Sequence, residues 1–244
     1  MQYILTSSPS VSMDGAINPA NGFLWQLQQI VPRRCRCVFV SSNPDVPAFG
    51  DHCTVCMAQA FEDVGFEFVA FDCLDRRNVD EAQGLVNAAD WIILGGGHVP
   101  TMNAFLNEIG FADMLADYDG LVMGISAGSM NMARVVYAQP EEKGEATDPE
   151  YKRFLPGLGI TDVQILPHYY MCKDAEVDGL LIYEEIALPD SRKGHRFFVF
   201  PDGTYLLGKD GKETIFGEFY IIENGVMRQI CHDGQSVELP FSYF

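Results

Sequence analysis

Short apolar runs alternate with longer segments of helical periodicity through the first two-thirds of the chain. The apolar runs have the length and composition of buried strands, and the segments between them have the length of helices. We expect strands at residues 1–6, 35–41, 67–71, 91–94 and 121–125, and helices at 51–63, 80–89, from 101 onward and at 127–137. Repeated strand–helix units of this kind predict an α/β fold with a mainly parallel sheet covered by helices on both faces.

The pattern changes after Tyr137. Residues 139–156 are polar and charged and are interrupted by prolines, which indicates a long surface loop or lid. From Arg196 onward the chain has the pattern of hairpins, with strands expected at residues 196–200, 205–207, 218–222 and 226–230. Because no repeat, low-complexity tract or linker interrupts the sequence, we expect residues 1–244 to form a single domain.

The composition is that of a globular protein, with 48% hydrophobic and 20% charged residues among 244. The formal net charge is −18, and nucleic acids and anionic membranes attract the opposite sign, so we expect neither as a partner. No apolar stretch in the sequence reaches the roughly 20 residues that a membrane-spanning helix needs. The segment 1–6 lacks the basic and apolar regions of a signal peptide, so we expect a cytoplasmic location.

The seven cysteines have no regular spacing, and in the cytoplasm we expect them to be reduced thiols rather than disulfides. His52, Cys53 and Cys56 resemble part of a metal site, but no second pair of ligands follows at zinc-finger spacing. The sequence therefore predicts neither a metal nor another cofactor.

The most informative segment is the expected strand 121–125 with the residues that follow it. This strand runs into Gly-x-Ser-x-Gly, and helix-forming residues come directly after, which predicts a nucleophile elbow centred on Ser126. Glycines at 124 and 128 allow the sharp turn, and the serine then projects at the carboxyl end of the sheet. An ordinary strand–helix turn that happens to contain serine is the alternative for this motif taken alone.

A serine hydroxyl needs a base to become a nucleophile. Of the five histidines, His168 is the best candidate, because it follows a short apolar strand and strand ends on the elbow side gather active-site groups. The glycines at 95–97 follow another expected strand, and their amides could stabilise a developing negative charge together with the amide of Ala127. We expect His98, which follows these glycines, to line the substrate pocket rather than to act as the base.

Three motifs together make a specific resemblance. The segments 91–97 (Trp-Ile-Ile-Leu-Gly-Gly-Gly), 124–128 (Gly-Ile-Ser-Ala-Gly) and 166–169 (Leu-Pro-His-Tyr), in this order and spacing, resemble the peptidase E (aspartyl dipeptidase) family, which includes the cyanophycinases. The resemblance extends from the first strand to the turn at 200–203. It implies a three-layer α/β sandwich of the class I glutamine amidotransferase (flavodoxin-like) kind, here with C-terminal β-hairpins.

The resemblance also implies a serine peptidase with Ser126 as nucleophile and His168 as general base. It implies an oxyanion hole formed by the amides of Gly96, Gly97 and Ala127. The best-known members of the family split dipeptides that have an N-terminal aspartate. This sequence departs from the family at His98, where Asn often follows the glycines, and in an extended loop at 143–156, so aspartyl specificity does not carry over directly.

The acid that orients the histidine is open among three carboxylates. Glu141 and Glu142 fall where the family pattern has an acidic residue after the elbow, and we favour Glu141. Asp202 is the rival, because an acidic residue in a Pro-acid-Gly turn recurs in the family. Each has a simpler reading, as a solvated loop charge or as an ordinary turn residue.

A carboxylate-binding cation would support aspartyl specificity. Arg134 on the expected elbow helix is the candidate for substrate binding, followed by Lys152 and Arg153, although surface charge is the preferred explanation for each of them.

The leading functional hypothesis is therefore a peptidase that takes short peptides as its partners and acts as a monomer or homodimer. An α/β-hydrolase-like esterase is the second enzyme hypothesis, with Asp202 and His232 as its late acid and base. A catalytically inactive relative that binds a small molecule is the non-enzyme hypothesis. A glutamine amidotransferase is disfavoured because its elbow nucleophile is cysteine.

Overall fold

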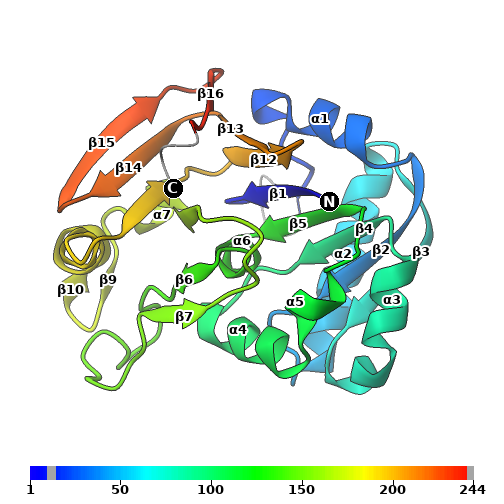
Figure 1. Ribbon diagram of the computed structural model, residues 1–244, viewed down its shortest axis with the longest axis horizontal. Helices are drawn as coiled ribbons and strands as arrows, with labels where there is room; N and C mark the ends of the chain where they lie inside the picture. The colour runs from blue at the N-terminus through cyan, green and yellow to red at the C-terminus, as the bar shows by residue number, and fades with distance from the viewer. Residues whose placement is uncertain (10–14, 241–244) are drawn as a thin grey trace.

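The central feature of the computed structural model, which describes residues 1–9 and 15–240, is an eight-stranded mainly parallel sheet (Figure 1). Its parallel part consists, in spatial order, of β1 (Gln2–Thr6), β5 (Leu121–Ile125), β4 (Trp91–Leu94), β2 (Arg34–Val40) and β3 (Glu67–Leu74). Three antiparallel strands extend it beyond β1, namely β12 (Tyr205–Lys209), β13 (Lys212–Phe216) and β16 (Ser236–Glu238).

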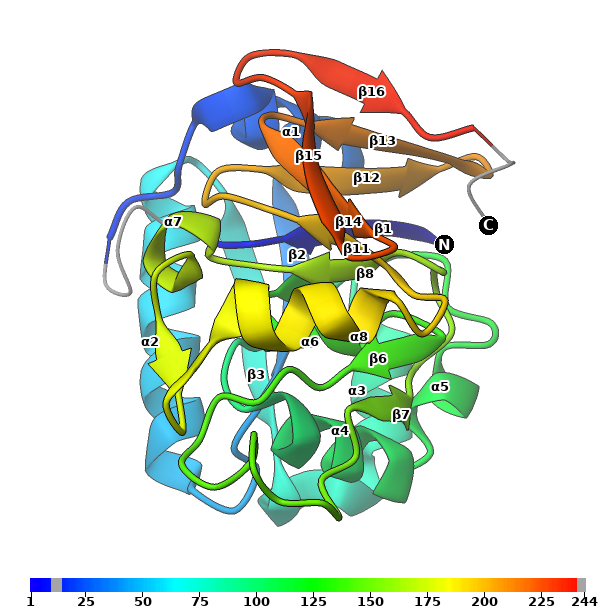
Figure 2. The ribbon, with the colours of Figure 1, turned by 90° about the vertical axis from the view of Figure 1, so that its left-hand side faces the viewer.

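A smaller four-stranded sheet lies beside the antiparallel end of the large one. It consists of β8 (Gln164–Leu166), β11 (Arg196–Val199), β14 (Phe219–Glu223) and β15 (Val226–Cys231). Two short pairs complete the strands, β6 (Val135–Tyr137) with β7 (Phe154–Pro156) and β9 (Glu176–Val177) with β10 (Leu180–Leu181). Figure 2 shows β8 and the short helix α7 (Tyr169–Cys172) on the near side of the central sheet.

The helices cover both faces of the central sheet. They are α1 (Phe23–Ile30), α2 (Pro47–Asp63), α3 (Ala82–Ala88), α4 (Val99–Glu108), α5 (Phe111–Met114), α6 (Ala127–Asn131) and α8 (Leu188–Ser191), with 3-10 turns at Ala20–Gly22 and Arg76–Glu81 and a π-helical turn at Ile182–Ala187. Within the described ranges, every helix is too short or too polar to cross a bilayer.

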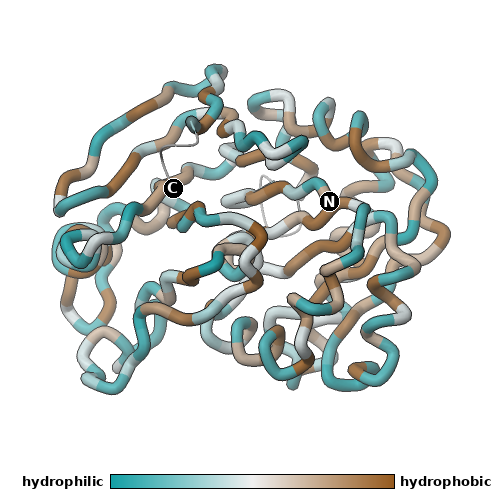
Figure 3. The backbone as a smooth tube through the Cα atoms, in the orientation of Figure 1, coloured by the Kyte–Doolittle hydropathy of each residue, from teal (hydrophilic) through white to brown (hydrophobic). Residues whose placement is uncertain are grey.

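Successive side chains along a strand point to opposite faces of the sheet, so the protein has two separate hydrophobic cores, one on each face. Ile4 packs with the apolar faces of α1 and α2, whereas its neighbour Leu5 packs with α3 to α6 on the other face. On β4, Ile93 likewise packs in the core with Ile4, and Ile92 packs in the core with Leu5. Figure 3 shows the hydrophobic stretches gathered on the central strands. The arrangement is a three-layer α/β sandwich with C-terminal hairpins, as the sequence predicts.

The prediction of a helix at 127–137 is wrong after Asn131, where α6 ends. Instead of continuing, the chain forms β6, whose β-branched residues Val135 and Val136 pair with β7. The backbone N–H of Arg134 donates to the carbonyl of Thr161, so long-range pairing replaces the next helical turn. Six strands of the described residues were not predicted, namely β6, β7, β9, β10, β13 and β16.

The segment 139–156, expected as a long surface loop or lid, is anchored at several points. Its end forms β7 against β6, and the carboxylate of Asp178 accepts the N–H groups of Gly144 and Ala146 at 2.8–3.0 Å. Arg153 forms an ion pair of 3.0 Å with the buried Asp190. These contacts give the segment a fixed course over the protein.

Candidate active site

Ser126 occupies a sharp, strained turn between β5 and α6. Its backbone has φ 49° and ψ −112°, a conformation that costs about 1–3 kcal/mol in a residue with a side chain. A Cβ on Gly124 would lie 2.5 Å from the backbone of Ser129, and one on Gly128 would lie 2.2 Å from the carbonyl oxygen of Leu94. Both glycines are therefore required by close packing, and the expected elbow is present.

The elbow is held to the neighbouring strand β1. The N–H of Ser126 donates to the carbonyl of Thr6 at 3.0 Å, and Ser129 Oγ hydrogen-bonds with both the N–H and the carbonyl of Thr6 at 2.9 Å. In the sheet, Thr6 lies in register with Ile125, the residue before the serine. The end of β1 therefore fixes the position of Ser126.

The glycine loop after β4 lies directly beside the elbow. A Cβ on Gly96 would lie 3.5 Å from the Cβ of Ser126. The carbonyl of Gly96 accepts a hydrogen bond of 2.5 Å from Ser42 Oγ. Because a trans peptide directs its C=O and N–H in opposite directions, the N–H of Gly97 faces away from Ser42.

The amides of this loop are available to bind a ligand. Within the described part of the chain, the N–H groups of Gly96 and Gly97 have no acceptor. Ala127 is the first residue of α6, and the first amides of a helix lack intrahelical partners. The three predicted oxyanion-hole residues therefore border the same serine.

His168 follows β8 in a left-handed conformation with φ 58°. Its N–H donates to Ser7 Oγ at 2.8 Å, and its ring Nδ1 lies 2.8 Å from Oδ1 of Asp202. Ser7 Oγ donates to the same Oδ1 at 2.6 Å. Because an ionised carboxylate can only accept, Nδ1 carries the proton and Nε2 is the free ring nitrogen.

The environment of Asp202 keeps it ionised. Burial by itself raises the pKa of this carboxyl, but the hydrogen bonds from His168 and Ser7 outweigh burial, so that the pKa lies below its usual value. Ser7 is fully buried and directly follows Thr6, the residue that holds Ser126. The Thr6-Ser7 pair thus connects the serine with the histidine and its acid.

The structure does not support the preference for Glu141 as the partner of the histidine. The carboxylate in contact with the His168 ring is that of Asp202. Glu141 is solvent-exposed, and its backbone N–H donates to Oε2 of Glu145, which is itself bonded to His98. In the described part of the chain, its carboxylate makes no hydrogen bond with the His168 ring.

A carboxylate that the sequence did not single out connects the glycine loop with the segment 139–156. Glu145 Oε1 lies 2.8 Å from Nε2 of His98, and Glu145 Oε2 accepts the N–H groups of Glu141 and Glu142 at 2.8 and 2.9 Å. Burial raises the pKa of Glu145, but these hydrogen bonds lower it by more. The other nitrogen of His98, Nδ1, contacts Thr101 Oγ1 at 2.7 Å.

The same cluster contains the residues best placed to hold a metal. Among the described residues, the ligand atoms of His98, Glu142 and Glu145 lie within 4.8 Å of one another. Both oxygens of Glu145 are already engaged with His98 and with backbone amides. Hydrogen bonding accounts for the closeness of His98 and Glu145.

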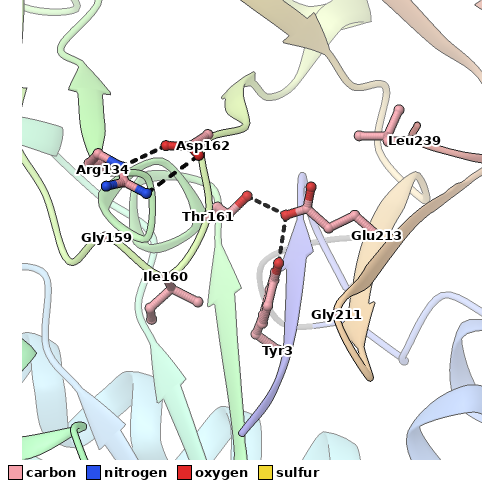
Figure 4. A pocket seen from close by; sticks show the side chains of 9 residues that line it. All are labelled: Tyr3, Arg134, Gly159, Ile160, Thr161, Asp162, Gly211, Glu213 and Leu239. Carbon is pink, nitrogen blue, oxygen red and sulfur yellow. Dashed lines mark hydrogen bonds and ion pairs between the residues drawn. The ribbon is translucent and has the colours of Figure 1, made fainter. Parts of the chain in front are cut away.

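Arg134 does not join the groups around Ser126. It forms an ion pair of 2.7 Å with Asp162 and lines a different cavity of about 190 Å³ (Figure 4). Tyr3 and Thr161 both donate to Glu213 in that cavity. The elbow helix α6 and the turn after it separate Arg134 from the serine, so its predicted substrate-binding role has no support in the geometry.

Ser7 and Glu145 are the site residues that sequence reasoning missed. Ser7 directly follows a strand and Glu145 lies in a charged loop, and neither belongs to a motif. A polar residue at the carboxyl end of a central strand was the only available signal, and it points to Ser7.

Two solved structures share the fold. One is the crystal structure of a peptidase from an acI-B1 Actinobacterium, at 15% identity and a TM-score of 0.69, covering 98% of this chain and 96% of that chain. The other is a protein from Listeria monocytogenes EGD-e assigned as a peptidase E protein, at 15% identity and a TM-score of 0.57, covering 94% of this chain and 98% of that chain. At this identity the likeness concerns the fold alone.

The family follows from the sequence match. The model of peptidase family S51 matches residues 3–214, and the chain therefore belongs to that family. Membership indicates a peptidase. No curated protein matches the chain significantly.

Proposed function

We propose that the protein is a serine peptidase that hydrolyses short peptides, dipeptides among them, through an acyl-enzyme. One observation carries the proposal: the His168 ring is held by Asp202, and both are tied through Ser7 to the strand that fixes the elbow serine. A nucleophile, a base and an orienting acid are the parts that this chemistry requires.

In the proposed reaction, Ser126 Oγ attacks the scissile carbonyl while Nε2 of His168 takes the hydroxyl proton. The carbonyl oxygen becomes an oxyanion that accepts hydrogen bonds from the amides of the glycine loop and of Ala127. The imidazolium then gives its proton to the leaving amine as the C–N bond breaks. Water, deprotonated by the same ring, hydrolyses the resulting ester and restores the serine.

Asp202 has two tasks in this scheme. Its hydrogen bond with Nδ1 selects the tautomer in which Nε2 is free to accept a proton, and its charge stabilises the imidazolium. Ser7 positions the carboxylate and the backbone of the histidine at the same time. The chain order of the three groups is serine, histidine, acid.

That order disfavours the esterase hypothesis. In α/β-hydrolases the acid precedes a late histidine, which would have to be His232 here. The Nδ1 atom of His232 instead lies 3.1 Å from Nε2 of Gln229, on β15 of the smaller sheet. Asp202 contacts His168 and not His232.

A fluorophosphonate probe tests the proposal, because it forms a covalent bond with an activated serine. We expect one adduct by intact mass, abolished in Ser126→Ala and retained in Ser236→Ala, which changes an exposed serine on β16. Absence of an adduct on the folded wild-type protein would refute the proposal and favour the inactive relative. Hydrolysis of short peptides, also abolished in Ser126→Ala, separates a peptidase from other serine hydrolases.

A further inference from the structure

The oxyanion hole of the proposed site depends on the peptide between Gly96 and Gly97. The orientation of this peptide decides which of its polar groups faces the nucleophile, the N–H that can donate to an oxyanion or the C=O that would repel it. A glycine on each side lets the peptide rotate at little steric cost. A peptide in this place therefore needs a contact that selects one orientation.

Ser42 supplies that contact from the buried side of the loop. Its hydroxyl donates to the carbonyl of Gly96 at 2.5 Å, and the residue is only 1% exposed. In the described part of the chain, this is the hydrogen bond that reaches the peptide, whose N–H on Gly97 has no acceptor. Gly97 itself is exposed. The peptide is thus held by its carbonyl and free at its amide.

The loop lies between two serines. A Cβ on Gly97 would collide with Oγ of Ser42 and lie 3.0 Å from its Cβ, whereas a Cβ on Gly96 would lie 3.5 Å from the Cβ of Ser126. Gly97 also has φ 153°, a conformation that residues with a side chain rarely adopt. Because the Gly96 carbonyl points at Ser42, the opposed N–H of Gly97 lies on the side of the nucleophile.

The sheet fixes Ser42 relative to the loop. Strands β2 and β4 are parallel neighbours with Val40 in register with Leu94, and the N–H of Gly95 donates to the carbonyl of Val40 at 3.0 Å. Ser42 follows Val40 by two residues, as Gly96 follows Leu94. The strand pairing that builds the sheet therefore brings the hydroxyl and the carbonyl to the same level.

We infer that Ser42 is a positioning residue of the proposed peptidase, whose hydroxyl holds the Gly96–Gly97 peptide with the N–H of Gly97 available to the oxyanion. This inference rests on the proposed function. In this role Ser42 acts through the orientation of one amide rather than by contact with the reacting atoms. Loss of an oxyanion-hole donor costs about 10²–10³ in rate, and loosening the donor without deleting it should cost about 10- to 100-fold.

The test compares Ser42→Ala with Ser41→Ala by the second-order rate of fluorophosphonate labelling. The phosphoryl oxygen of the probe occupies the oxyanion hole as the serine attacks, so the rate depends on the amide. Ser41 is buried in the same turn and accepts the N–H of Asn43 at 3.3 Å, so its replacement also removes a buried hydroxyl and a hydrogen bond. We expect Ser42→Ala to be labelled about 10- to 100-fold more slowly than wild type and Ser41→Ala within about threefold of it.

The pH dependence of labelling separates positioning of the amide from damage to the base. The rate rises with pH as the base loses its proton and then reaches a plateau. Ser42→Ala should lower the plateau and leave the midpoint of the rise unchanged, because the hydrogen bond between His168 and Asp202 is untouched. A shifted midpoint would assign the loss to the base and overturn the inference.

The wild-type protein separates failure of this inference from failure of the proposed function. If wild type is labelled and Ser42→Ala is labelled as fast as Ser41→Ala, the proposed function stands and the inference falls. If folded wild type is not labelled, both fall. If Ser42→Ala does not fold, Ser42→Cys, which keeps a weaker S–H donor, decides: slower labelling with an unchanged midpoint supports the inference, and the wild-type rate overturns it.

Discussion

Replacing Asp202 by asparagine tests the assignment of the orienting acid. In the structure both hydrogen bonds reach the same oxygen, Oδ1, one from the His168 ring and one from Ser7. Asparagine can present its oxygen in that place and keep both bonds, so the substitution removes the charge and leaves the geometry. The loss therefore measures the attraction between the carboxylate and the imidazolium.

The magnitude follows from Coulomb's law. Two unit charges about 4 Å apart attract by about 4 kcal/mol at an effective dielectric constant of about 20. The side chains of His168 and Asp202 are 26% and 37% exposed, and solvent reduces the attraction further. A loss of about 2–3 kcal/mol slows the reaction by about 30- to 150-fold.

The assay is the second-order rate of fluorophosphonate labelling, which needs no knowledge of the substrate. Asp202→Ala removes both hydrogen bonds as well as the charge and is expected to approach a loss of about 10⁴-fold. Asp117→Asn, an exposed residue after α5, is the control for a general effect of charge.

A particular result would contradict this reasoning. If Asp202→Asn labels within about threefold of wild type while Glu141→Gln slows labelling by more than about tenfold, Glu141 is the orienting acid. Asp202 would then be a turn residue that contacts the histidine without orienting it for catalysis.

Three further predictions concern the elbow, the buried serine and pH. Gly124→Ala places a methyl group 2.5 Å from the backbone of Ser129 and should lower the free energy of unfolding in urea by about 3 kcal/mol; a loss under 0.5 kcal/mol would contradict the packing described for the turn. Ser7→Ala leaves the N–H of His168 without its acceptor and should cost about 1–3 kcal/mol of stability in the same measurement, together with slower labelling. Burial raises the pKa of the Asp202 carboxyl, but the hydrogen bonds from His168 and Ser7 outweigh it and hold the pKa below its usual value, so their contribution to stability is complete above the pKa of an unfolded aspartate and is lost as pH falls through the lowered pKa. The free energy of unfolding in urea should therefore fall more steeply on acidification in wild type than in Asp202→Asn, and equal slopes would contradict these hydrogen bonds.

The sequence predicts the elbow well because its causes are local. Gly124, Ser126 and Gly128 lie within five residues of one another. The close packing of the turn requires both glycines, and the turn presents the serine between them. The parallel sheet is predicted for a similar reason, since each strand is a continuous apolar run. The helix at 127–137 fails because pairing with β7, which begins at Phe154, competes with local propensity.

The orienting acid could not be chosen from the sequence because the choice depends on long-range topology. Glu141 and Asp202 lie on opposite sides of His168 in the chain, and both follow patterns that an acidic residue can satisfy. The placement of β11 beside β8 brings the turn after β11 to the histidine. Ser7 and Glu145 act through contacts with residues far from any motif, so spacing alone does not indicate them.

The central place of β1 has a consequence for how the protein becomes active during folding. This strand is an inner strand of the sheet, paired with β5 on one side and β12 on the other. Ser7 and Asp202 are separated by 195 positions, and their hydrogen bond also orients the histidine. The proposed catalytic machinery is therefore complete only when these distant segments have come together, and acquisition of labelling during refolding reports closure of the sheet around β1.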